Sequence, residues 1–321
     1  MSIILAIIIF SFIIIFHELG HFLVAKKCDV KVNEFCLGLG PTLLHFTKGE
    51  TTYSLKLLPF GGACMMEGED EDSQDDRAFN HKPLWQRAAI VAAGPFFNFI
   101  LAYVLSVILI GAIGYDVPKL AGVMEGSSAE EEGLAAGDTI LALDGYRVHF
   151  YQEYSVQVTP QYNEEAGRYL LGLQGDYTRI KGNIPTTLAY GFYEMKYQIY
   201  ATFESLKMLV TGQLSVNDMS GPVGIVKTIG DTYDESVSSG AFYVAMNMIN
   251  IAILLSANLG VMNLLPIPAL DGGRLLFFLI EAIRGRQMNE EIEGRIHLVG
   301  FMLLMVLMVV VMFNDIQKLF V

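Results

Sequence analysis

Four long apolar stretches constrain the fold of this chain more than any other feature. They cover residues 2–25, 88–115, 242–270 and 297–313, and about 20 apolar residues let an α-helix cross the hydrocarbon core of a bilayer. Charged residues make up only 17% of the 321 residues, against about 25% in soluble domains. We therefore expect a polytopic α-helical membrane protein with four transmembrane helices, for which the lipid bilayer is a partner.

Basic residues predict how the chain crosses the membrane. None precedes the first stretch, whereas Lys26 and Lys27 follow it, so the positive-inside rule places its C-terminal end in the cytosol. Because this stretch also lacks a small-residue cleavage site, we expect it to remain as a transmembrane helix. Alternating crossings then give transmembrane helix 1 (1–27), a cytosolic-side loop (28–87), transmembrane helix 2 (88–115), an extracytoplasmic domain (116–190), an amphipathic helix with a GPVGI sequence (191–240), transmembrane helix 3 (241–273), a cytosolic loop (274–296) and transmembrane helix 4 (297–321).

Charge and cysteine content argue against nucleic acid binding, a disulfide framework and a cysteine-based zinc site. The net charge is −13, and clustered Lys and Arg are needed to bind phosphates, so we expect no nucleic acid partner. The three cysteines, Cys28, Cys36 and Cys64, are odd in number and form no C-x-x-C pair. We expect reduced thiols rather than a disulfide framework or a cysteine-based zinc site.

The first inner loop contains a predicted β-hairpin. Residues 52–57 alternate between polar and apolar with period two, and Lys48-Gly49-Glu50 has the composition of a turn. Glycine and proline bracket the segment on both sides. We expect this hairpin to lie at the inner membrane surface or to dip into it.

The outer segment has the pattern of a small α+β domain. Ser127 or Ser128 is the expected N-cap of a short helix that ends at Gly133. Asp144-Gly145 is a hairpin turn sequence. The aromatic-rich residues 191–214 that follow are typical of an amphipathic helix at a bilayer surface.

Three ionisable residues interrupt the first apolar stretch, in the sequence His17-Glu18-Leu19-Gly20-His21. On a helix, positions i and i+4 share one face, so both imidazoles can reach one metal ion. Glu18 lies beside them and can take a proton from water. Such groups cost a few kcal/mol inside a membrane unless they are paired, which favours a functional site. We expect Zn²⁺ at His17 and His21. The isolated His45, His81, His149 and His297 are instead expected to be satisfied core histidines.

A catalytic zinc needs a third protein ligand, and Asp271 is the predicted one. It is the only acidic residue between Glu235 and Glu281, and it lies at the inner end of its stretch, as His17 and His21 do. Pro266 and Pro268 interrupt the helix, and non-helical backbone at membrane depth is tolerated only against protein or a wet cavity. The alternative is that Asp271 caps a helix at the membrane surface.

These motifs resemble the site-2 protease family of intramembrane zinc metalloproteases, in particular the bacterial RseP-like branch with an extracytoplasmic PDZ domain. The resemblance rests on HELGH (17–21) and NLLPIPALDGG (263–273). It extends, in the order of the family, to GLGP (38–41), LLPFGG (57–62), DDRAFNHKPLWQRAAIVAAGPFFNF (75–99) and GPVGI (221–225).

The resemblance implies specific roles. His17, His21 and Asp271 would bind zinc, Glu18 would be the catalytic acid and base, and Asn263 would contact the substrate backbone. The hairpin would pair with substrate as an added strand. The implied substrate is a single-span membrane protein or peptide, such as an anti-sigma factor or a remnant signal peptide. The implied location is the bacterial cell membrane, with the active site toward the cytosol and the PDZ-like domain outside.

One departure from the family pattern concerns that outer domain. After residue 145 the chain is short by about a helix and one or two strands of a PDZ domain, so we expect a shortened PDZ-like unit. Two alternative functions stay open from the sequence. One is a membrane ion or metal transporter in which the histidines and Asp271 relay an ion, and the other is a non-enzymatic PDZ scaffold.

Overall fold

A computed structural model describes residues 1–69, 73–116, 120–138, 142–143, 146–147, 161–163, 168–170, 173–175, 179–213 and 220–318. This part of the chain is mostly helical. Four helices within it are long and apolar enough to cross a membrane, which confirms the predicted helical class. They are α1 (Ser2–Lys27), α2 (Leu84–Ile113), α6 (Ala241–Leu264) and α8 (Glu290–Lys318).

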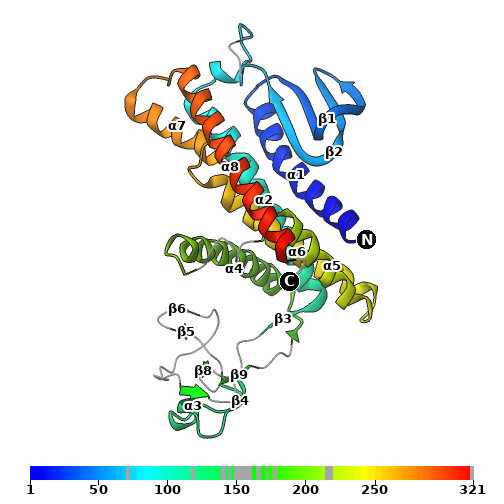
Figure 1. Cartoon of the computed structure of the whole chain (residues 1–321), viewed down its shortest axis with the longest axis vertical. Helices are drawn as coiled ribbons and strands as arrows, with labels where there is room; N and C mark the ends of the chain where they lie inside the picture. The colour runs from blue at the N-terminus through cyan, green and yellow to red at the C-terminus, as the bar shows by residue number, and fades with distance from the viewer. Residues whose placement is uncertain are drawn as a thin grey trace. The chain divides into compact units, whose positions relative to one another are not determined.

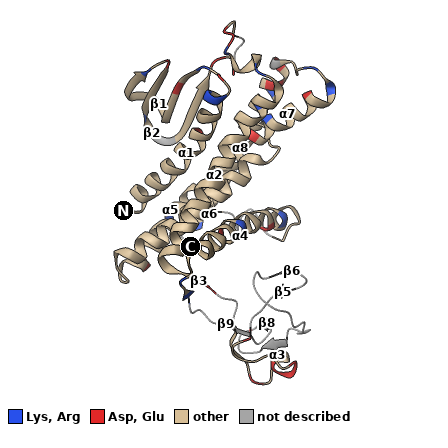
Figure 2. Cartoon of the chain, turned by 180° about the vertical axis from the view of Figure 1, so that it is seen from behind, with Lys and Arg blue, Asp and Glu red and all other residues tan. Residues whose placement is uncertain are grey.

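Charged residues avoid the middle of these helices. Figure 2 shows that Lys, Arg, Asp and Glu gather around α7 (Asp271–Arg284) and the neighbouring loops, while α1, α2 and α8 are almost free of them along most of their length. Residues 274–296, expected as a loop, are mostly helical, because α7 extends to Arg284 and α8 begins within the interval. The helix α8 also begins at Glu290, several residues before the expected start of the last crossing.

The chain divides into two compact units, one of residues 1–109 with 191–321 and the other of residues 110–190. In the first unit, α1 packs closely on α2. A Cβ atom built on Gly20 would lie 2.4 Å from the backbone oxygen of Ala93, so only glycine allows this approach. Buried Ile13 of α1 and Leu101 of α2 belong to one core cluster with Ile229.

The predicted hairpin is present as β1 (Val32–Lys48) and β2 (Thr51–Met66), which are antiparallel and joined at Gly49-Glu50. Figure 1 shows this sheet beside α1. The strands are long and curled, so residues 34–37 pair on two sides, with 62–65 and with 52–55. Residues 62–66 therefore form an edge whose second side has no strand partner among the described residues.

The GPVGI sequence begins α5 (Pro222–Val237). Asp315 of α8, only 3% exposed, accepts hydrogen bonds from the N–H groups of Gly221 (3.1 Å) and Gly224 (2.8 Å). A carboxylate is stabilised at a helix N-terminus by the free N–H groups and the helix dipole. This contact explains how an acidic residue is accommodated in an otherwise apolar helix.

The described residues of the second unit include several short strand pairs and the short helix α3 (Ser128–Glu131). This helix has Ser127 as N-cap, which accepts a hydrogen bond from Glu130 N–H, as the sequence predicted. The expected turn at Asp144-Gly145 lies outside the described residues, although the strands on either side of it, β5 (Ala142–Leu143) and β6 (Tyr146–Arg147), are paired. The pairs are β3 (Tyr115–Asp116) with β10 (Arg179–Ile180), β4 (Leu120–Val123) with β9 (Leu173–Gly175), β5 (Ala142–Leu143) with β6 (Tyr146–Arg147), and β7 (Gln161–Asn163) with β8 (Arg168–Leu170).

Candidate metal centre

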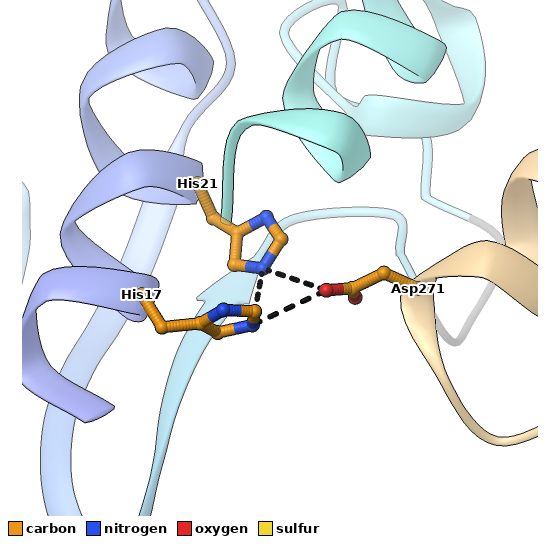
Figure 3. A group of neighbouring side chains, drawn as sticks. All are labelled: His17, His21 and Asp271. Carbon is orange, nitrogen blue, oxygen red and sulfur yellow. Dashed lines mark hydrogen bonds and ion pairs between the residues drawn. The ribbon is translucent and has the colours of Figure 1, made fainter. Parts of the chain in front are cut away.

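His17 and His21 project from the same face of α1, one turn apart. Their Nε2 atoms lie 3.2 Å from each other, and both side chains are largely buried, with each residue 8% exposed. The helix extends to Lys27, so its own hydrogen bonds fix the spacing of the two rings. Figure 3 shows both Nε2 atoms directed toward the carboxylate of Asp271.

Asp271 reaches the two imidazoles because the chain stops being helical just before it. Helix α6 ends at Leu264, since Pro266 and Pro268 lack the N–H that would continue it, and α7 begins at Asp271 itself. The Oδ2 atom of Asp271 lies 3.2 Å from Nε2 of His17 and 3.5 Å from Nε2 of His21. The N-cap of α7 is Leu270 and Asp271 is the first helical residue, so its distances to the two imidazoles favour the ligand role over that of a surface cap.

Two glycines hold this turn tightly. A Cβ atom on Gly272 would lie 2.2 Å from the backbone oxygen of Leu265, and one on Gly273 would lie 2.5 Å from that of Ile267. Ala269, two residues before Asp271, has a positive φ of 78°, which is uncommon for a residue with a Cβ atom. The conformation that presents Asp271 therefore depends on Gly-Gly following it.

The three side chains fit a zinc ion. Ligand bonds of about 2.0–2.1 Å at tetrahedral angles separate two ligand atoms by about 3.3–3.4 Å, and the observed separations are 3.2, 3.2 and 3.5 Å. Oδ2 of Asp271 is buried and meets neither ring nitrogen with hydrogen-bond geometry. Two imidazoles and one carboxylate are also a ligand set of catalytic zinc sites.

Both candidate histidine ligands are held from behind by α2. Nδ1 of His21 lies 2.9 Å from the backbone oxygen of Ile90, and Nδ1 of His17 lies 3.2 Å from Nδ2 of Asn98. Metal-binding histidines commonly use their second ring nitrogen in this way. Sequence analysis missed Asn98. The polar side chain in an apolar helix, four residues after Gly94, could have indicated it.

Glu18 lies between the metal centre and the edge of the sheet. Its side chain is half-buried and forms a hydrogen bond to the backbone of Cys64 in β2. Gly62 also lies against this side chain, because a Cβ atom on Gly62 would be 3.0 Å from Cγ of Glu18. The side chain that sequence analysis selected as the catalytic base thus adjoins residues 62–66.

Asn263 is also close to the cluster. It occupies the last turn of α6, and its Nδ2 atom lies 3.5 Å from Nε2 of His17. The structure thus brings Asn263 beside His17 of the proposed ligand set.

The isolated histidines differ from expectation. His45 and His81 are exposed, so the prediction of core histidines was wrong for both, because β1 and the loop before α2 leave them at the surface. His149 lies outside the described residues. His297 is half-buried on α8, and its Nδ1 atom accepts a hydrogen bond of 2.8 Å from Ala269 N–H.

Two buried histidines on a helix that is long and apolar enough to cross a membrane face a partly buried aspartate at the start of α7, and a glutamate lies beside them. This arrangement defines a candidate membrane-embedded metallohydrolase. The sequence matches Peptidase family M50 over residues 5–307, and the chain belongs to that family. It is a zinc metalloprotease, and its cofactor is Zn²⁺.

Individual relatives agree with this assignment. The chain is 39% identical to a Clostridium acetobutylicum protein provisionally named a zinc metalloprotease, with 98% of this chain and 97% of the relative covered. It is 32% identical to the zinc metalloprotease RasP of Bacillus licheniformis and to the regulator of sigma-W protease RasP of Bacillus subtilis, with 99% of each chain covered. The alternatives of a transporter and a scaffold find no support in these relatives.

Proposed function

We propose that this protease hydrolyses a peptide bond within the membrane-spanning segment of a single-span membrane protein. The observation that carries the proposal is the meeting of His17 and His21, on the apolar helix α1, with Asp271, which follows the apolar helix α6 in the chain. A site at this depth is reached most directly by a substrate that is itself in the membrane. The protein would accordingly be an integral protein of a bacterial cell membrane.

His17, His21 and Asp271 are the proposed zinc ligands. Bound zinc supplies Lewis-acid polarisation of a carbonyl and makes water more acidic. Glu18 takes a proton from the attacking water as the new C–O bond forms at the scissile carbonyl carbon. It then gives that proton to the amide nitrogen as the C–N bond breaks, so that one residue acts as base and then as acid.

The sheet edge beside Glu18 is the proposed binding site of the substrate backbone. A helical substrate has its carbonyl groups in hydrogen bonds from i to i−4, so it must unwind before it is cut. Residues 62–66 offer an edge without a second strand partner among the described residues, and strand addition would replace the lost hydrogen bonds. Asn263, close to His17, is positioned to bind a substrate backbone group.

The proposed orientation places the metal centre toward the cytosol. Lys26 and Lys27 at the end of α1 and the basic residues after α7 support this. The exposed leucines and Phe46 of the hairpin support its contact with lipid. In Figures 1 and 2, α4 (Ile184–Val210) runs at a steep angle to the spanning helices, as an interfacial helix would.

The second unit is the proposed shortened PDZ-like domain on the extracytoplasmic side. The alignments with RasP run over 425 positions, whereas this chain has 321 residues, so RasP carries segments that this chain lacks. We propose that the domain limits access by substrates with bulky outer portions. Membrane-anchored anti-sigma factors and remnant signal peptides are the substrate classes that fit, and the name of the Bacillus subtilis relative, regulator of sigma-W protease, agrees with the first.

The test is cleavage of a model single-span protein by the purified full chain in lipid nanodiscs. Glu18→Gln should retain one zinc and lose cleavage by at least about 100-fold, because it removes the proton acceptor. Asp271→Ala should lose both zinc and cleavage. Cleavage that survives in Glu18→Gln, or the absence of zinc from active protein, would contradict the proposal.

A further inference from the structure

We propose that Asn98 is a positioning residue that fixes the ring of His17 through its amide oxygen. The proposal rests on the proposed ligand role of His17. It also gives a role to the GPFFN sequence (94–98), which is part of the stretch 75–99 that supports the family resemblance and which the reaction itself does not use. Asn98 is 0% exposed, and its amide lies 3.2 Å from Nδ1 of His17.

His21 shows what the second ring nitrogen of a ligand requires. Its partner, the backbone oxygen of Ile90 at 2.9 Å, can only accept a hydrogen bond. Nδ1 of His21 therefore carries the proton, and its Nε2 lone pair faces Asp271. The backbone thus selects the ring form of His21 that can bind a metal.

His17 needs the same form but has a side chain as its partner. Its Nε2 atom faces Asp271 and His21, so in a zinc ligand Nδ1 must carry the proton and must find an acceptor. The only acceptor on the Asn98 amide is Oδ1. That atom is buried and has no hydrogen-bond partner among the described residues.

The two ends of an amide are interchangeable by a half-turn of the group. Such a turn brings Oδ1 to Nδ1 of His17 and gives both atoms a partner. The backbone of Asn98 does not need to move, because only the terminal amide group turns, and its backbone carbonyl oxygen keeps the 2.8 Å hydrogen bond that Ser256 Oγ of α6 donates. Asn98 can therefore serve the ring in either proton arrangement while its Cα stays fixed.

Three variants of the full chain separate this role from simple packing. Asn98→Leu keeps the approximate size and removes the acceptor, whereas Asn98→Asp keeps the acceptor and adds charge. Ser256→Ala is the matched control, because it removes a buried hydrogen bond to the same residue without touching its side chain. Each is purified in nanodiscs, its zinc Kd is measured by chelator competition, and the visible spectrum of its Co²⁺ form is recorded.

Asn98→Leu should weaken zinc about 10- to 100-fold, as is typical when such a partner is lost, and should change the Co²⁺ spectrum. Asn98→Asp should restore the affinity to within a few-fold of wild type, and Ser256→Ala should leave both readouts unchanged. Equal zinc affinity in wild type and Asn98→Leu would overturn the inference about Asn98 and leave the proposed ligand set intact. Equal weakening in Asn98→Leu and Asn98→Asp would do the same. Wild-type protein without zinc would instead overturn the proposed ligand set.

A measurement on the unmodified chain covers the case in which Asn98→Leu does not fold. In zinc-loaded protein with ¹⁵N-labelled histidine, both His17 and His21 should show a protonated Nδ1 that is protected from exchange. A His17 Nδ1 that is unprotonated, or that exchanges as fast as the exposed His45, would contradict the role of Asn98.

Discussion

Gly94 of α2 lies directly against His21 of α1, so closely that a Cβ atom on Gly94 would be 2.2 Å from the Nε2 atom of His21. The same Cβ atom would be 2.8 Å from Cε1 of His17. The helix α2 therefore leaves the space in which the two imidazoles meet. The two imidazoles can therefore meet at a metal ion only because residue 94 has no side chain.

The first prediction is that Gly94→Ala abolishes zinc binding while the protein stays folded. Alanine favours a helix over glycine by up to about 1 kcal/mol, so the helix itself should tolerate the change. Gly111→Ala in the same helix is the matched control, because its Cβ atom would lie 3.6 Å from its nearest neighbour, Thr187. Zinc content by mass spectrometry should be near zero for Gly94→Ala and unchanged for Gly111→Ala. Full zinc content in both would show that the contact does not matter.

The second prediction concerns His297, whose Nδ1 atom accepts a hydrogen bond from Ala269 N–H. This contact holds the turn that presents Asp271, and misplacement of a catalytic group by about 1 Å can slow a reaction about 100-fold. His297→Phe should therefore lower kcat by about 10- to 100-fold. His297→Asn, whose amide oxygen can accept the same bond, should retain most of the activity. Equal rates for Phe and Asn variants would argue against the anchor.

The third prediction concerns the ion pair between Arg87 and Glu281, whose side chains are only 9% and 14% exposed and lie 2.5 Å apart. Breaking a buried pair leaves one charge without a partner and costs about 3–5 kcal/mol. Arg87→Met should destabilise the protein by that order in a thermal unfolding assay. The double variant with Glu281→Leu should recover most of the loss. A double variant as unstable as Arg87→Met would mean that the charge pairing is not the cause.

The fourth prediction is a pH dependence of the hairpin tip. Hydrogen bonds from Arg77 and Lys26 lower the pKa of Glu50 from 4.5 to about 2. Because the folded pKa is the lower one, this contribution to stability is complete above about pH 4.5 and is lost as the pH falls toward 2. Hydrogen exchange of residues 46–53 should be slower in wild type than in Glu50→Gln at pH 7, and the difference should vanish near pH 2. A difference that is independent of pH would contradict this origin.

Much of this architecture could be predicted from the sequence because its determinants are local. Apolar length predicted the spanning helices, period-two alternation predicted the hairpin, and the spacing of His17 and His21 predicted a shared face. Asp271 could be selected because an acidic residue beside two prolines is rare in such a stretch.

Other features depend on contacts between distant segments and could not be predicted in this way. Asn98 contacts His17 because α1 packs against α2. His297 lies on α8 but contacts Ala269, in the connection between α6 and α7. His45 and His81 are exposed because their segments lie at the surface of the folded chain. None of these leaves a periodic pattern in the chain.

The central claim is that one zinc ion is held by two imidazoles and one carboxylate. The most direct test is X-ray absorption at the zinc edge of the purified full chain, compared with Asp271→Ala. The account predicts one zinc per chain with two nitrogen ligands at about 2.0–2.1 Å and oxygen ligands at about 2.0–2.2 Å. It also predicts loss of that zinc in the variant. A sulfur shell at about 2.3 Å, which would implicate Cys64 or Cys36, or an unchanged spectrum in Asp271→Ala, would contradict it.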